Sequence, residues 1–340
     1  MMITCTHNIE GRKSTVKYEE KIIIDGLDTS LWGSDSVYRA LRAGGVTAIN
    51  ATIAIWDDYE STLKNITKYL EWFQEFADLI VHVKTTDDIY KAKAANRTGI
   101  IFGWQNASPI GNELNRLRLF YELGVRIIQL TYNERNLLGN GCYERTDEGL
   151  SRFGLAVVEE MNRLGILIDL SHVGDRTTLD AIENSNQPVA ITHANARSQI
   201  NHPRNKTDEA IKLLVEHGGV IGANAFPMFF NKGFETTLDE YIDAIDYLVQ
   251  MVGINHVAVG TDFCTEQPRS FFEWLFASQG QIPAKEVAYT PEPYSHLKDF
   301  KDQTEWVRLA EGLQKRKYAD KDIEKILGKN WLELFDKVWV

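Results

Sequence analysis

The chain has 340 residues and a formal net charge of −11; 44% of the residues are hydrophobic, 25% charged and 11% aromatic. This composition is typical of a folded globular protein and not of a disordered one. The acidic charge, without a Lys/Arg-rich run, argues against nucleic acid as a partner, because nucleic-acid binding relies on basic patches. No stretch approaches the roughly 20 uninterrupted apolar residues of a membrane span, so we expect no membrane partner.

The cysteines and the N-terminus bear on the cellular compartment. Cys5, Cys142 and Cys264 are odd in number and widely spaced, which predicts neither a disulfide framework nor a zinc knuckle. The N-terminal residues become charged before an apolar segment of signal-peptide length appears. Both features favour a soluble protein of the reducing cytoplasm.

Eight short apolar runs have the character of buried parallel strands, and amphipathic stretches with helical periodicity separate them. The predicted strands are residues 21–25, 46–55, 98–103, 125–131, 165–170, 188–192, 219–223 and 256–261, and the predicted helices are 35–43, 59–76, 112–123, 149–164, 175–185, 208–217 and 237–252. This alternation predicts a (β/α)8 barrel of the TIM type, with an open doubly wound sheet as the alternative. We expect a single domain over residues 1–340, with a short N-terminal extension, a long loop over residues 268–300 and a closing helix in "KDIEKILGKNWLELFDKV".

Two histidines and an aspartate follow predicted strands at the end where such barrels carry their active sites. His172 and His193 come after the adjacent fifth and sixth strands, and Asp262 comes after the eighth. Two neutral imidazoles on neighbouring strands can hold one zinc ion, and the aspartate can move the proton of a metal-activated water. Each histidine alone would more simply be a hydrogen-bonded structural residue, but the joint placement of all three favours a metal-dependent hydrolase.

The loops after the strands supply candidates for substrate binding. Arg204, in "NHPRNKTD", is suited to hold a substrate carboxylate by two parallel hydrogen bonds, and a surface salt bridge is the alternative. Tyr132 and Asn133 open the loop after the fourth strand, which is rich enough in hydrogen-bonding groups to recognise a substrate. Asp169 of "DLSH" could orient a metal ligand, although a cap for the following turn is the interpretation we favour.

Several segments resemble the membrane (renal) dipeptidase family of zinc metallopeptidases, within the amidohydrolase superfamily. The segments are "GVRIIQLTYNERN", "GLAVVEEMNRLGILIDLSHVGDRTTLDAI", "PVAITHANARSQINHPRNKTDEAIKLLVEHGGVIGAN", "VAVGTDF" and "GKNWLELF", of which "DLSH" and "ITHANAR" are the most specific. The resemblance covers the chain from about the first strand to the C-terminus. It implies a (β/α)8 barrel that hydrolyses dipeptides with two zinc ions, and a homodimer. It also makes His172 and His193 metal ligands, Arg204 the carboxylate clamp and Asp262 the catalytic acid/base.

The chain departs from the family pattern around the first metal. The family begins with Asp-Gly-His-Asn-Asp, whereas this chain has Leu27 and Asp28 within "DGLDT". The bridging glutamate of the family corresponds to Gln105 in "FGWQNASP", which is neutral and a weaker ligand, and a family histidine corresponds to Tyr132. We therefore expect one zinc per chain, with Asp28, or the carbonyl oxygen of Gln105, as a replacement ligand.

Three hypotheses for the function follow. The first is a metal-dependent hydrolase that cleaves the amide bond of a dipeptide or an N-acyl amino acid. The second is a catalytically weak or inactive barrel that binds a small carboxylate-bearing ligand in the same cavity. The third, a metal-independent lyase or isomerase, rests only on the versatility of the fold.

Overall fold

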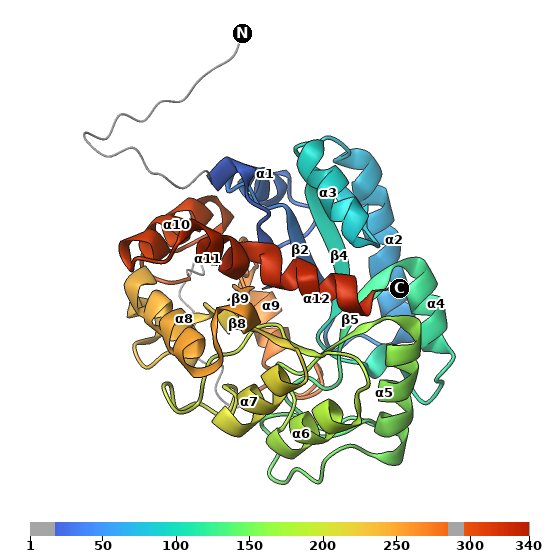
Figure 1. Cartoon of the computed structure of the whole chain (residues 1–340). Coiled ribbons are helices and arrows are strands. Elements are labelled where there is room, and N and C mark those ends of the chain that lie inside the picture. The colour runs from blue at the N-terminus through green and yellow to red at the C-terminus, as the bar shows by residue number, and fades with distance from the viewer. Residues whose placement is uncertain (1–17, 285–295, 340) are drawn as a thin grey trace, which may run out of the picture.

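The computed structural model describes residues 18–284 and 296–339. Eight parallel strands form a nearly closed barrel with helices between them (Figure 1). In barrel order the strands are β1 (Ile24–Asp28), β2 (Ala48–Ala54), β4 (Thr98–Trp104), β5 (Val125–Gln129), β6 (Leu167–Asp169), β7 (Ala190–Ile191), β8 (Val220–Asn224) and β9 (Val257–Gly260). β1 and β9 meet where Asp28 forms a parallel bridge with Phe263 and the Asp262 N–H donates to the Leu27 carbonyl at 3.0 Å. The predicted (β/α)8 barrel is confirmed, and the open-sheet alternative is wrong.

The predicted helices are present, with ends that differ by a few residues. They are α1 (Asp35–Ala43), α2 (Tyr59–Glu75), α4 (Arg116–Leu123), α5 (Arg152–Leu164), α6 (Asp175–Asn184), α7 (Asp208–Glu216) and α8 (Leu238–Val252). α5 begins later than predicted because the Ser151 side chain caps it, accepting a hydrogen bond from the Gly154 N–H. α2 begins at a capping box in which Asp58 and Ser61 satisfy each other's backbone N–H groups.

Between α2 and β4, the structure contains one strand and one helix that the sequence pattern does not predict. These are β3 (Ile80–Val83) and α3 (Thr86–Ala94). β3 pairs with Thr98–Ile101 of β4, and β5 pairs with Phe102–Trp104 of the same strand. β3 therefore adds to the sheet outside the eight-strand order.

The segments after β9 contain more helix than predicted. α9 (Arg269–Leu275) lies within the segment predicted as a long loop, and α10 (Trp306–Lys315) was not predicted. α11 (Asp320–Glu324) and α12 (Asn330–Val338) fall in the segment predicted as the closing helix. Residues 285–295 of the predicted loop and residues 1–17, which include Cys5 and most of the predicted N-terminal extension, lie outside the described residues. Among the helices that are described, none is both long enough and apolar enough to cross a membrane.

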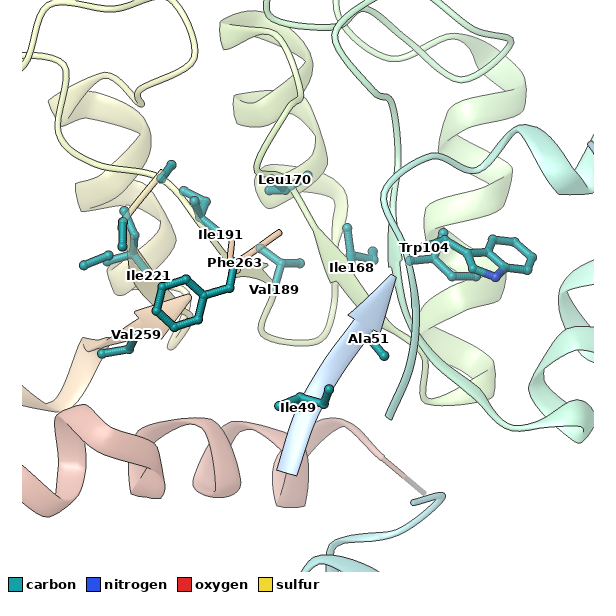
Figure 2. Packing of buried hydrophobic residues seen from close by; sticks show 14 of the residues in the cluster. Ile49, Ala51, Trp104, Ile168, Leu170, Val189, Ile191, Ile221, Val259 and Phe263 are labelled. Carbon is teal, nitrogen blue, oxygen red and sulfur yellow. The ribbon is translucent and has the colours of Figure 1, made fainter. Parts of the chain in front are cut away.

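Two apolar clusters hold the barrel together. In the larger cluster, strand residues such as Ile49, Ile168, Ile221 and Val259 pack with apolar residues of the surrounding helices, and Figure 2 shows part of this layer. The smaller cluster joins the first residues of the strands, for example Ala190 and Ala258, to one face of α12. α12 therefore covers the N-terminal end of the barrel (Figure 1), which leaves the C-terminal ends of the strands for the site.

Trp331 of α12 forms the centre of this floor. Its side chain is fully buried, and its indole N–H donates to the Val259 carbonyl at 2.9 Å. The ring lies directly against Gly26 and Gly222, because a Cβ atom on these glycines would come within 2.7 and 2.9 Å of it. The N-terminal end of the barrel is thus closed by the Trp331 ring, which fits there because Gly26 and Gly222 have no side chains.

Candidate active site

The structure brings His172 and His193 together. His172 lies in the turn after β6, and His193 follows β7 by two residues. Both side chains are buried, and their Nε2 atoms lie 3.1 Å apart. The two predicted metal ligands therefore face each other.

Hydrogen bonds on the other side of each ring decide which nitrogen carries the proton. Nδ1 of His172 lies 2.7 Å from Oδ1 of Asn133, which can only accept, so this Nδ1 is protonated. Nδ1 of His193 lies 2.7 Å from the Thr192 hydroxyl, whose own hydrogen goes to Oδ2 of Asp169 at 2.7 Å. This Nδ1 is therefore protonated as well. Both Nε2 atoms carry bare lone pairs.

The two imidazoles are neutral. Burial lowers the pKa of both histidines well below the usual value, and the nearby positive charge of Arg204 lowers it further. Two lone pairs at 3.1 Å repel each other unless a cation lies between or beside them. The pair is thus chemically suited to bind a metal ion.

Asp169 supports the pair from behind. Its carboxylate accepts hydrogen bonds from the Ser171 hydroxyl at 2.6 Å and the Ser171 N–H at 3.1 Å, and so it caps the turn before His172. It also accepts from the Thr192 N–H at 2.9 Å and from the Thr192 hydroxyl that holds His193. The predicted turn cap is therefore present, and the same carboxylate orients His193. The sequence signal for this arrangement is the threonine directly before His193, whose hydroxyl links the ring to Asp169.

Three glycines leave space for the strand that carries His193. A Cβ atom on Gly26, Gly222 or Gly260 would come within 2.7, 2.1 or 1.9 Å of the Thr192 carbonyl oxygen. Only residues without a side chain allow so close an approach of another strand. The backbone next to His193 is therefore held inside the barrel by contact on several sides.

Arg204 lies beneath the histidines. It is fully buried, so the surface salt bridge considered for it is excluded. Its Nη1 donates to the Ser171 carbonyl at 2.6 Å and its Nη2 to the His193 carbonyl at 2.7 Å. Its Nε is buried and has no hydrogen-bond partner among the described residues, and the Phe229 ring lies 5.4 Å from the guanidinium carbon. The arginine thus joins the backbones of the two histidine-bearing turns, and its Nε stays without a partner among the described residues.

Asp262 has a strained backbone and a perturbed carboxyl group. Its φ of +56° lies in the left-handed region, and its N–H is held by the Leu27 carbonyl. Nδ2 of Asn224 donates to its Oδ2 at 3.3 Å. Burial raises the pKa of Asp262 to about 6, although Arg204 and Asn224 oppose the shift. A carboxyl group with this pKa can exchange a proton near neutral pH.

Gln105, Tyr132 and Asn133 lie around His172. Nε2 of Gln105 donates to the Thr52 hydroxyl at 3.0 Å. The Tyr132 ring stacks on the His172 imidazole with centroids 4.1 Å apart, and Asn133 is the residue that fixes the His172 tautomer. Asn133 adopts a positive φ of 57°, which asparagine tolerates better than most residues. All three predicted residues therefore lie near the histidine pair.

Asp28 is tied to the C-terminal part of the chain. Its Oδ1 accepts from the Ser30 N–H at 2.8 Å, and its Oδ2 accepts from Nε2 of Gln303, also at 2.8 Å. Burial raises the pKa of Asp28 to about 6. Across residues 18–284 and 296–339, no three His, Cys, Asp or Glu side chains are grouped so that they could hold a metal ion.

A cavity of about 250 Å³ opens next to these residues. Gln105, Asn133, His172 and Asp262 contribute to its polar side. Apolar side chains from the segments that follow β8 and β9 also line the cavity: Phe226, Met228, Phe229, Leu275 and Phe276. The cavity can thus take a small molecule whose polar centre faces His172 and Asp262.

The sequence profile of the membrane dipeptidases (peptidase family M19) matches residues 25–273. The chain belongs to the membrane dipeptidase family. It is 37% identical to an amidohydrolase from Pseudomonas aeruginosa whose crystal structure superposes with a TM-score of 0.90, over 95% of this chain and 98% of that one.

More distant relatives include a metallopeptidase from Rhodobacter sphaeroides, solved with a phosphinate mimic of the dipeptide L-Ala-D-Ala. At 21% identity and a TM-score of 0.76, over 94% of this chain and 100% of that one, it shows the same fold. An uncharacterised dipeptidase of Schizosaccharomyces pombe is 35% identical over 188 residues, which are 53% of this chain and 45% of that protein. The chain spans about half the length of the curated relatives that it matches.

Proposed function

We propose that this member of the membrane dipeptidase family is a metal-dependent hydrolase that cleaves the amide bond of a dipeptide or an N-acyl amino acid. The observation that carries the proposal is the pair of bare Nε2 lone pairs on His172 and His193, 3.1 Å apart and beside a cavity that also contains Asp262. Family membership supports the class of reaction.

The donor set fits one metal ion. We propose His172 and His193 as its protein ligands, with zinc as the ion, because zinc accepts neutral imidazole nitrogens. Gln105 can add its carbonyl oxygen, since its amide nitrogen is already directed to Thr52. When bound, zinc supplies Lewis-acid activation of water and of the scissile carbonyl group.

The donor set does not fit the two ions that the family resemblance implies. The side chain of Leu27 has no atom that can ligate a metal, and the side chain of Gln105 lacks the negative charge that would bridge two cations. Both oxygens of Asp28 already accept hydrogen bonds, from Ser30 and Gln303, which hold the carboxylate in its present orientation and compete with a metal ion for it. One ion per chain remains the proposal.

Asp262 is proposed as the acid/base. Its carboxylate takes the proton of the attacking water and delivers it to the leaving amine nitrogen as the C–N bond breaks. The pKa of about 6 supports both roles, because each protonation state is accessible near neutral pH. Asn224 steadies the carboxylate for both transfers.

Arg204, Tyr132 and Asn133 are proposed to bind and orient the substrate. The Nε of Arg204, which has no partner among the described residues, is the donor proposed for a substrate carboxylate, and the Phe229 ring lies beside the guanidinium group. Tyr132 and Asn133 both contact His172, which supports a role for them at the reacting end of the cavity. The apolar wall then receives the substrate side chain.

The test is metal content per chain by elemental analysis, on protein purified without chelators or a histidine tag, followed by assay against dipeptides and N-acyl amino acids. About one zinc per chain with turnover supports the proposal, whereas two would mean that Asp28 or Gln105 rebuilds the first site. No metal and no turnover after zinc is added would favour the alternative, a barrel that only binds a small carboxylate-bearing ligand.

A further inference from the structure

A second cavity lies at the same end of the barrel as the cavity lined by His172 and Asp262, which we refer to as the catalytic cavity. Its volume is about 340 Å³, and residues that follow β1 and β2 contribute to its wall together with parts of α2 and α9. Five aromatic side chains line it: Trp32, Tyr69, Trp72, Phe271 and Trp274. We refer to it as the tryptophan cavity.

The tryptophan cavity is separate from the catalytic cavity. The two share Thr29 in their walls, whereas His172 and Asp262 line only the catalytic one. Between them, the Thr52 hydroxyl on one side accepts the hydrogen bond from Gln105 on the other. A ligand in the tryptophan cavity therefore need not touch the residues proposed for hydrolysis.

Asp57 is a half-buried carboxylate in the wall of the tryptophan cavity. Its Oδ1 accepts from Nδ2 of Asn65 at 3.0 Å, and its Oδ2 accepts from the Ile55 N–H at 3.2 Å. A carboxylate has about four acceptor positions, so each oxygen can accept a further donor. Within the described part of the chain, Asp57 forms no ion pair with Lys, Arg or His.

Burial and the aromatic wall both favour a cation at this position. Burial raises the pKa of Asp57, although hydrogen bonds from Ile55 and Asn65 oppose the shift, so a cation bound beside it would offset part of the cost of the buried charge. Aromatic rings attract cations through the negative potential of their faces, and tryptophan does so most strongly. Lys68 also lines the cavity, but its side chain is exposed, and within the described residues it forms no ion pair with Asp57.

We propose that the tryptophan cavity binds the ammonium group of a small organic cation, with Asp57 as the counter-ion and the aromatic side chains as the wall. This second site goes beyond the proposed hydrolysis and does not depend on it. The chemistry expected of the ligand is a positively charged nitrogen on an apolar or aromatic body, because five of the lining side chains are aromatic.

Isothermal titration calorimetry of the metal-loaded protein tests the proposal with three probes of similar size. These are benzylammonium, neutral benzyl alcohol and anionic phenylacetate. Benzylammonium is expected to bind about tenfold more tightly than benzyl alcohol, and phenylacetate most weakly. Equal binding of benzylammonium and benzyl alcohol, or no binding of benzylammonium, would overturn the proposal.

Two charge variants locate the ligand. Asp57→Asn keeps an acceptor oxygen and should remove most of the advantage of benzylammonium, whereas Glu71→Gln, an exposed carboxylate on α2 outside the cavity, should not change it. Lys68→Ala tests whether the cavity prefers a cationic or an anionic ligand. Removal of the lysine charge should strengthen the binding of an ammonium group and weaken the binding of a carboxylate. Weaker benzylammonium binding by Lys68→Ala would contradict the proposal. Lys68 is exposed, so this variant remains informative if Asp57→Asn unfolds.

A variant of the catalytic cavity completes the test. Asp262→Asn should bind benzylammonium as the unchanged protein does, because Asp262 does not line the tryptophan cavity. Loss of binding in Asp262→Asn with retention in Asp57→Asn would place the probe in the catalytic cavity and refute the second site. Matching thermal unfolding curves establish that each variant is folded.

Discussion

Nε2 of His172 and Nε2 of His193 lie 3.1 Å apart. Nδ1 of His172 is hydrogen-bonded to Oδ1 of Asn133, and Nδ1 of His193 is hydrogen-bonded to the hydroxyl of Thr192. Because the hydroxyl passes its hydrogen to Asp169, neither ring can turn its protonated nitrogen inward without losing a buried hydrogen bond. The two Nε2 atoms are thus held close together before any ligand arrives. Such preorganisation reduces the cost of binding a metal ion.

His193→Ala should abolish both zinc binding and hydrolysis, because one of the two proposed ligands is lost. Elemental analysis and a dipeptide assay measure the two effects separately. His217→Ala is the control, since His217 is exposed and, among the described residues, its Nδ1 contacts the carbonyl of Leu213 in the preceding helix. Full activity in His193→Ala would refute the assignment of the metal ligands.

Asp262→Asn should retain zinc and lose turnover. General acid–base groups contribute about 100- to 10,000-fold to the rate, so kcat should fall by about that factor. Asparagine keeps an oxygen that can accept the hydrogen bond from Asn224, which preserves the local structure. A variant with normal turnover would exclude Asp262 as the proton carrier.

The pH dependence of kcat/KM should reflect Asp262. Its pKa is raised from 3.8 to about 6, and the attacking water needs the deprotonated form, so activity should be lost as the pH falls through about 6. Asn224→Ala removes a hydrogen bond that lowers this pKa and should therefore move the acid limb to higher pH. A purely structural role for Asn224 would lower the rate without moving the limb.

Gln105→Glu should strengthen metal binding by about tenfold or more, because it restores a negative charge where the family resemblance implies a bridging glutamate. The Thr52 hydroxyl can turn to donate to the new carboxylate, so the local hydrogen bond can persist. Competition with a chelating dye gives the affinity, and elemental analysis shows whether a second ion enters. Gln281→Glu, which adds the same charge at an exposed position, should change neither quantity.

Gly222→Ala should destabilise the protein by about 1–3 kcal/mol or more, because the added methyl group would lie 2.1 Å from the Thr192 carbonyl oxygen. The clash displaces the backbone beside His193, so zinc affinity should fall together with the melting temperature. Thermal unfolding with and without zinc measures both. Unchanged stability would mean that β7 can shift without cost.

The barrel was predictable because eight buried strands have a distinct pattern of short apolar runs between amphipathic helices. β3 was missed because it has only four residues, and His82 interrupts its apolar pattern. His172, His193 and Asp262 could be found because chain order alone places strand ends together in this fold. The hydrogen bond between Asp28 and Gln303 joins residues 275 positions apart, and the buried Arg204 contacts Ser171, His193 and Phe229 from distant parts of the chain. No local pattern in the sequence reports such contacts.

The position of Trp331 also has a consequence for how the chain is made. Its ring fills the floor of the barrel beneath Gly26 and Gly222, in strands that leave the ribosome long before α12 does. Until the segment around Trp331 has been synthesised, the strand ends that it covers remain exposed to water and to other unfinished chains. The final assembly of this barrel, and of the histidine pair above it, is therefore an event that follows translation of α12.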